Sequence, residues 1–207
     1  MPEQERPSAK LLTDPRALRA LAHPIRLDLL AALRIEGPLT ATQAGELLDE
    51  SSASCSFHLR QLAKYGLVEE AGGGTGRQRP WRATARATVV PELTENPELA
   101  AASEFFWSKV AERYFEFMMS WLEASADEPA QWQQAAQFGD EFIYMTAAEL
   151  TALGEQLRAL IAPYRDRQHS PGLRPPGSRL VGYLPIALPV VNRGKRQGWP
   201  APGSDVR

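Results

Sequence analysis

The fold is decided by residues 39–84, which read LTATQAGELLDESSASCSFHLRQLAKYGLVEEAGGGTGRQRPWRAT. Thr40, followed three residues later by Gln43, has the spacing of a capping box, which marks the start of a helix. Residues 49–52 then interrupt the helical pattern and supply fresh N-cap side chains. We therefore expect two short helices that meet at a tight turn.

The second of these helices is predicted to run from about Ala53 to Tyr65. Cys55, Leu59 and Leu62 recur at the spacing of one helical stripe, which predicts a buried face. Gly66 is expected to end the helix in the left-handed conformation. The opposite face carries short hydroxyls followed by basic and amide side chains, which suit the phosphates and base edges of a DNA major groove. By itself, this face fits a solvated amphipathic helix equally well.

A β-hairpin is predicted directly after this helix, with residues 67–70 as one strand, a Gly-rich turn at 72–76 and residues 79–84 as the return strand. Three arginines lie at or near its tip: Arg77, Arg79 and Arg82. A basic ribbon of this kind can grip the DNA backbone or enter the minor groove. The glycines do not fit a phosphate-binding loop, because that motif needs a helix after the glycines. The order of elements is that of a helix-turn-helix followed by a wing.

Two earlier helices are expected to form the scaffold for the reading helix. Pro24 fits the first turn of the second one, which begins near His23 and ends at Gly37-Pro38. Their apolar residues recur at helical spacing: Leu18, Leu21, Ile25, Leu29, Leu30 and Leu33.

Two motifs in this region resemble those of ArsR-type winged-helix regulators. Residues 21–27, LAHPIRL, resemble the opening motif of the family, and residues 56–62, SFHLRQL, with YGLV at 65–68 resemble its recognition helix. The resemblance covers roughly residues 14–86. It implies a dimeric DNA-binding transcription regulator, often a repressor that an effector releases.

The residues expected to contact double-stranded DNA lie on the recognition helix and the wing: Ser52, Ser54, Ser56, Phe57, His58, Arg60, Gln61, Lys64, Arg77 and Arg79. For His58, a hydrogen bond within the domain is an equally good alternative. Cys55 lies on the inner stripe and is expected to be a buried structural thiol rather than a redox sensor.

The chain departs from the metal-sensing members of the family. Cys55 is its only cysteine, and its three histidines, His23, His58 and His169, are far apart in the sequence. This is not the ligand spacing of a zinc site, so we expect neither a metal nor a cofactor. The resemblance carries over DNA binding but not metal sensing.

Charge is distributed unevenly along the chain, although the net charge is only −2. Residues 1–90 carry 12 basic and 10 acidic side chains, residues 91–162 carry 3 and 13, and residues 163–207 carry 8 and 2. DNA would repel the acidic middle section, so contact should fall to the N-terminal domain and, at most, the basic tail.

A long helix is predicted from Glu98 to about Glu123, after a connector at residues 88–97. It carries two apolar stripes, whereas a helix that is buried on one side needs only one. A second copy of the chain is expected to cover one stripe and the C-terminal elements the other. The predicted homodimer contacts are Phe106, Val110, Tyr114, Phe117 and Trp121. The second stripe comprises Trp107, Ala111, Phe115, Met118 and Leu122.

Beyond this helix we predict a short helix near residues 131–138 and a capped helix from Thr146 to about Tyr164. Residues 142–145 are expected to form a strand that pairs with an edge strand at 179–188. Any effector is expected to be a small organic molecule bound between the long aromatic helix and the capped helix. The aromatic side chains of the long helix would fit equally well as part of the hydrophobic core, without any ligand.

The chain as a whole is predicted to be mainly α-helical with a small β-wing. Its expected parts are a disordered N-terminus (1–12), a winged helix-turn-helix domain (13–90), a helical dimerisation region with a two-stranded β element (91–190) and a disordered basic tail (191–207). No apolar run reaches membrane-spanning length and no signal peptide is apparent, and a lone cysteine suits a reducing cytoplasm.

No catalytic set is present in the sequence, so we do not expect an enzyme. The leading hypothesis is a homodimeric transcription regulator, acting as a repressor on a pseudo-palindromic site. The alternative is a winged-helix module that binds a protein instead of specific DNA. The basic wing favours the first.

Overall fold

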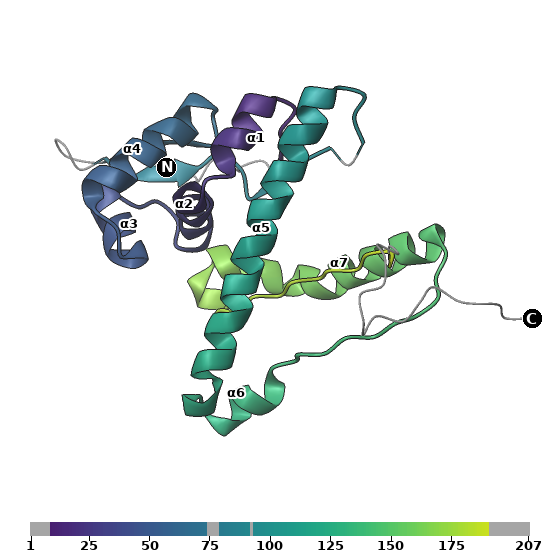
Figure 1. Ribbon diagram of the computed structural model, residues 1–207. Coiled ribbons are helices and arrows are strands. Elements are labelled where there is room, and N and C mark those ends of the chain that lie inside the picture. Colours follow the sequence, from purple (N-terminus) through teal and green to yellow (C-terminus); the bar gives the residue numbers. More distant parts are fainter. Residues whose placement is uncertain (1–8, 74–78, 92, 191–207) are drawn as a thin grey trace, which may run out of the picture.

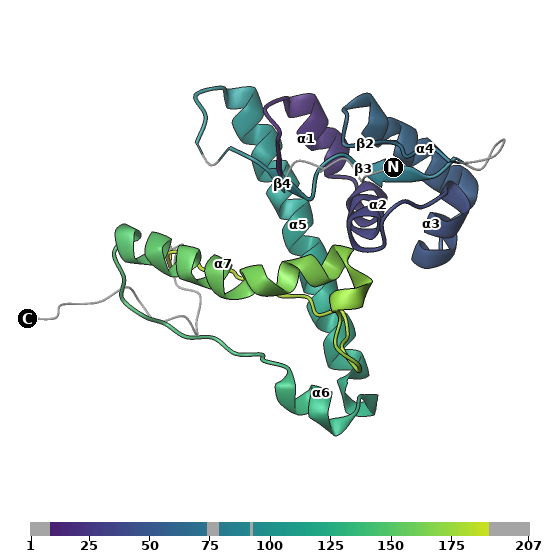
Figure 2. The ribbon, with the colours of Figure 1, turned by 180° about the vertical axis from the view of Figure 1, so that it is seen from behind.

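The computed structural model describes residues 9–73, 79–91 and 93–190. It is mainly helical with small strands, as predicted, and a long helix leads from the N-terminal domain to the C-terminal elements (Figures 1 and 2). Within the described residues, the N-terminal domain, called the headpiece here, contains the helices α1 (Pro15–Leu21), α2 (Pro24–Ile35), α3 (Ala41–Leu48) and α4 (Ser52–Lys64). The strands described in it are β1 (Ala9–Leu11), β2 (Val68–Glu70), β3 (Trp81–Ala83) and β4 (Ala87–Val89).

The headpiece core lies where α1, α2 and α4 meet. Its largest fully buried side chains include Leu18, Leu21, Leu29, Leu33, Leu59 and Leu62. Pro24 occupies the first turn of α2, and His23 is the N-cap residue, as the sequence predicts. Leucines at helical spacing on three helices therefore combine into one apolar core.

A tight turn at residues 49–51 joins α3 to α4. The predicted capping box is present at the start of α3, where the Gln43 backbone N–H donates to the Thr40 hydroxyl at 3.2 Å. Asp49 ends α3 in the left-handed conformation, with φ of 54°. Gly45 allows the chain to turn back closely, because a Cβ at this position would lie 2.5 Å from the Glu50 carbonyl oxygen. This turn fixes α4 against α3.

The predicted wing is present as an antiparallel pair of strands, β2 and β3, with Glu69 opposite Arg82. Gly66 follows Tyr65, the C-cap residue of α4, and is left-handed, as predicted, with φ of 63°. Residues 74–78 of the expected turn lie outside the described residues.

The prediction that residues 1–12 are disordered is wrong for the last four of them. Ala9–Leu11 forms β1, which pairs in parallel with β4 at the start of the expected connector, and Leu12 is buried. Lys10 explains why this segment is held: its ammonium group donates to the carbonyl oxygens of Tyr65 and Gly66, at the C-terminal end of α4. A cation is favourable at that end of a helix.

The long helix α5 (Pro97–Ala124) agrees closely with the predicted bounds and is capped by the Asn96 side chain. Its N-terminal half packs against α1, and its buried residues are Leu99, Ala102, Phe106 and Val110. The assignment of Phe106 and Val110 to a dimer interface is therefore corrected, because the chain's own core already covers them. The C-terminal half of α5 extends beyond the headpiece (Figure 1).

The C-terminal elements follow α5 as a short 3-10 turn, η1 (Ser125–Asp127), then α6 (Ala130–Ala135), α7 (Ala147–His169) and η2 (Pro171–Leu173). The capping box of Thr146 and Glu149 is present, as predicted. The helix continues past the expected end at Tyr164 and includes Pro163 in its interior. In both views α7 crosses the line of α5 (Figures 1 and 2), and Gln168 donates to the carbonyl oxygen of Arg34 near the end of α2.

The predicted two-stranded β element is wrong, because neither residues 142–145 nor residues 179–188, all of them described, form a strand. The second segment instead lies against α5 and α6. Gly182 contacts the Phe117 ring so closely that a Cβ there would come within 2.5 Å of the ring. Arg179 pairs with Glu128 and lies over the ring of Trp132. These side-chain contacts, which hydropathy does not reveal, take the place of backbone pairing.

Among the described residues, no helix combines the length and the apolar character that crossing a membrane requires.

Candidate DNA-binding surface

The outer face of α4 is the centre of the candidate site. Ala53, Phe57, Arg60 and Lys64 lie along it at intervals of three and four residues, and all four are exposed. On the inner face, Cys55, Leu59 and Leu62 are fully buried, as predicted. The helix is thus fixed by its apolar stripe, and the opposite stripe is free to enter a groove.

The other predicted contact residues of α4 lie on the sides of this face. Ser52 is exposed in the first turn, whereas Ser54, Ser56 and Gln61 are half-buried. Ser51 caps the helix by accepting a hydrogen bond from the Ser54 backbone N–H at 3.1 Å. The small side chains at the start of α4 would let its N-terminus come close to a DNA backbone.

His58 does not lie on the outer face, contrary to its predicted contact with DNA. Only 8% of its surface is exposed, and its ring centroid lies 4.7 Å from that of His23. The physical reason is its position, three residues after Cys55 and four before Leu62, which places it on the buried stripe. His58 therefore links α4 to the start of α2, in line with the alternative of a role within the domain.

The surroundings of the two histidines favour their neutral forms. Burial, followed by the charge of Arg26, lowers the pKa of His23. Burial, followed by the neighbouring His23 and Arg26, lowers the pKa of His58, while Glu50 acts in the opposite direction. Nδ1 of His58 and Nε of Arg26 are buried and have no hydrogen-bond partner among the described residues. Protonation of either histidine would place a further positive charge next to Arg26, beneath α4.

We expect the stability of the chain to fall as the pH drops below the ordinary histidine pKa of about 6.5. In that range the unfolded state binds protons that the folded state resists, so folding becomes less favourable, whereas above about pH 6.5 this contribution is flat. Urea denaturation between pH 5 and pH 8 should show a smaller loss for His58→Phe than for the wild type. All other side chains are the same in the two proteins, so the difference between their losses reports on His58 and its coupling to His23. Equal losses would contradict the prediction.

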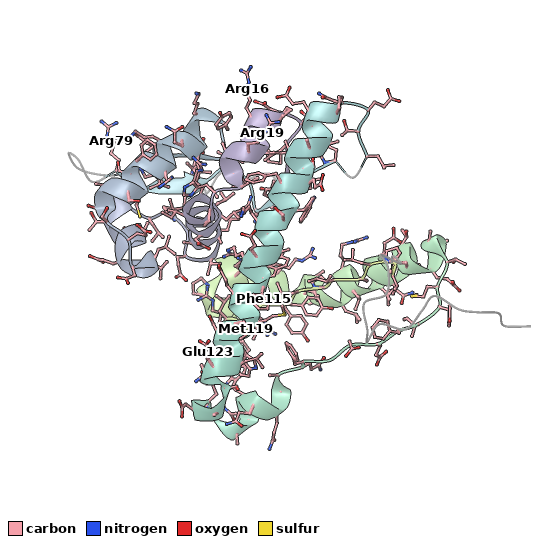
Figure 3. All side chains as sticks on the ribbon, viewed as in Figure 1. Arg16, Arg19, Arg79, Phe115, Met119 and Glu123 are labelled. Carbon is pink, nitrogen blue, oxygen red and sulfur yellow. The ribbon has the colours of Figure 1, made fainter. Side chains whose placement is uncertain are left out.

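The wing presents fewer free charges than the sequence suggests. Arg79 is exposed but pairs with Glu70 at 2.9 Å, and Arg82 pairs with Glu69 at 2.8 Å. Such surface pairs contribute little to stability, so a phosphate could replace the glutamate. Arg77 lies outside the described residues. In Figure 3, Arg79 lies at the opposite end of the headpiece from Arg16 and Arg19 of α1.

Two positioning residues were not found from the sequence. Lys10 holds the end of α4, as described above. The apolar pair Leu11-Leu12, just before the α1 cap, was the sequence feature that could have indicated an ordered segment here. Arg34 donates to the Ala85 carbonyl at 3.1 Å and to the Thr88 hydroxyl at 2.8 Å. Burial lowers the pKa of Arg34 to about 10. Arg34 ties the end of α2 to the strand that follows the wing.

Cys55 is fully buried on the inner stripe, as predicted, and burial followed by the charge of Glu50 raises its thiol pKa. This is the opposite of the lowered pKa that a reactive thiol needs. Among the residues that the structure describes, no three His, Cys, Asp or Glu side chains are grouped as a metal ion requires.

A family model described as a helix-turn-helix domain matches residues 21–71. The matched range begins at the end of α1 and includes α2, α3, α4 and β2, so it contains the whole outer face of α4. No curated protein matches the chain significantly. The fold and the match together define a protein with an N-terminal helix-turn-helix domain followed by long helices. Such a domain suggests DNA-binding transcriptional regulation.

Proposed function

We propose that the chain is a homodimeric transcription regulator, acting as a repressor, that binds a pseudo-palindromic site in double-stranded DNA. The observation that carries the proposal is the division of α4 into a fully buried inner stripe and an exposed outer stripe with two basic side chains, Arg60 and Lys64. A recognition helix needs this division, because it must be held rigidly while its outer side chains reach base edges.

The proposed dimer uses the C-terminal half of α5. Phe115 is 60% exposed and Leu122 is 46% exposed, on the second apolar stripe. Phe115, Met119 and Glu123 follow one another down the part of α5 that extends beyond the headpiece (Figure 3). Phe117 is also exposed, although it contacts Gly182. Aromatic side chains of this kind are enriched at protein interfaces. We therefore assign the dimer contacts to the second apolar stripe in the C-terminal half of α5, and not to Phe106 and Val110.

Two classes of DNA contact are expected to respond differently to mutation. Arg60→Ala or Gln61→Ala should relax base preference at one position of each half-site, at about 1–3 kcal/mol, because these side chains can form bidentate contacts with bases. Arg79→Ala should weaken binding to every sequence and reduce the salt dependence, because a wing arginine contacts phosphates. Selection of binding sites from random duplexes, followed by fluorescence anisotropy at several salt concentrations, measures both. Equal losses on selected and random DNA for Arg60→Ala and Gln61→Ala would count against base reading by α4.

The alternative function, a winged-helix module that binds a protein, is favoured by one observation. The wing glutamates Glu69 and Glu70 pair with Arg82 and Arg79, which lowers the net positive charge of the ribbon. The selection experiment separates the two functions, since a protein-binding module would enrich no duplex sequence.

An organic effector bound between α5 and α7 stays a prediction. Leu160 and Tyr164 on α7 are exposed, and Leu150, Leu153 and Leu157 are only half-buried. A second copy of the chain would have to help enclose such a site. Quenching of tryptophan fluorescence by a ligand, together with release of DNA, is the expected signature.

A further inference from the structure

Phe57 is an apolar side chain at the centre of the outer face of α4. Half of its surface, 50%, is exposed. Its neighbours along this face are the small Ala53 and the basic Arg60 and Lys64, and Ser54 and Ser56 lie to its sides. The exposed half of this large aromatic ring is thus available to an apolar group of a bound partner.

The ring of Phe57 is held in place from below. It meets the His58 ring edge to face, with centroids 5.1 Å apart and planes at 78°. His58 is itself buried and contacts His23, the α2 cap, with the two ring planes tilted by 41°. This geometry is a favourable one for aromatic pairs. It gives Phe57 a defined direction outward from the helix, as a side chain that reads a surface needs.

We propose that Phe57 reads the 5-methyl group of a thymine in the major groove, an inference that rests on the proposed DNA binding. The methyl group of thymine is the apolar group that the base pairs present in that groove, and phenylalanine is among the side chains that contact it. The small residues Ala53, Ser54 and Ser56 near Phe57 allow the helix to come close enough. Phe57 would then contribute specificity without a hydrogen bond, beside Arg60.

The test uses the full chain and its selected duplex, with each thymine replaced in turn by deoxyuridine, which lacks only the methyl group. Binding of the wild type should weaken about threefold to fivefold at one thymine per half-site, the effect of one buried methyl group. Phe57→Ala should bind more weakly overall and no longer distinguish thymine from uracil there. Phe57→Leu should retain part of the discrimination, because it keeps an apolar contact.

Leu47→Ala is the matched control, because Leu47 is also exposed and apolar (52%) but lies on α3. It should discriminate as the wild type does. Thermal unfolding followed by circular dichroism checks that each variant is folded, and Phe57→Leu decides the matter if Phe57→Ala does not fold. A selected duplex whose thymines all tolerate uracil, or a Phe57→Ala protein as sensitive as the wild type, overturns this inference alone. A chain that selects no duplex overturns the proposed function with it.

Discussion

Replacing Phe106 with alanine is expected to lower the free energy of unfolding by about 3–5 kcal/mol. Phe106 is 5% exposed and belongs to the hydrophobic core that the headpiece shares with α5. Truncating its ring would leave a cavity in the core where α5 packs against the headpiece, which it contacts mainly through α1. Urea denaturation at a fixed protein concentration measures the loss, since dimer stability depends on concentration.

Phe105→Ala is the matched control for this experiment. It removes the same ring from the same helix, but at a position that is 47% exposed and lies outside the proposed dimer stripe. Its effect on stability should stay below about 1 kcal/mol, as for other surface substitutions. If both variants lost the same stability, the assignment of Phe106 to the intrachain core would be wrong.

Phe115→Glu is expected to raise the dissociation constant of the homodimer by about 100-fold or more, because it places an unpaired charge in the middle of the proposed apolar interface. The headpiece should remain folded, since Phe115 is outside the buried core. Binding to a two-half-site duplex should weaken sharply, whereas binding to a single half-site should change little. Sedimentation equilibrium and anisotropy measure the two effects.

Gln131→Glu provides the control, because it introduces the same charge at an exposed position of α6. This variant should dimerise as the wild type does. A wild-type chain that sediments as a monomer at micromolar concentration, yet binds DNA tightly, would falsify the dimer proposal.

Local patterns in the sequence were sufficient for most of the helices. Thr40 with Gln43 and Thr146 with Glu149 mark two helix starts, and both capping boxes are present. Cys55, Leu59 and Leu62 define the buried stripe of α4. These features depend on residues within one or two helical turns, so the chain needs no distant contact to specify them. The outer face of α4, and with it most of the candidate site, follows from the same periodicity.

His58 illustrates what helical periodicity can and cannot predict. Its spacing from Cys55 and Leu62 already placed it on the inner stripe, but its polar ring suggested DNA contact. What the sequence alone could not show is its partner, because His23 lies on another element and is 35 positions earlier in the chain. The packing of α4 on the start of α2 brings the two rings together.

The remaining features were decided by tertiary structure. Two apolar stripes on α5 predict two covers, but only folding determines that α1 and the headpiece core cover Phe106 and Val110. Likewise, Lys10 and Thr88 are far apart in the chain, and their strands pair only once the headpiece has formed. The segment at 179–188 has the hydropathy of a strand, yet it forms no strand and is held by contacts with Phe117, Glu128 and Trp132. Periodicity specifies which face of an element is apolar, whereas the element that covers this face depends on contacts between distant residues.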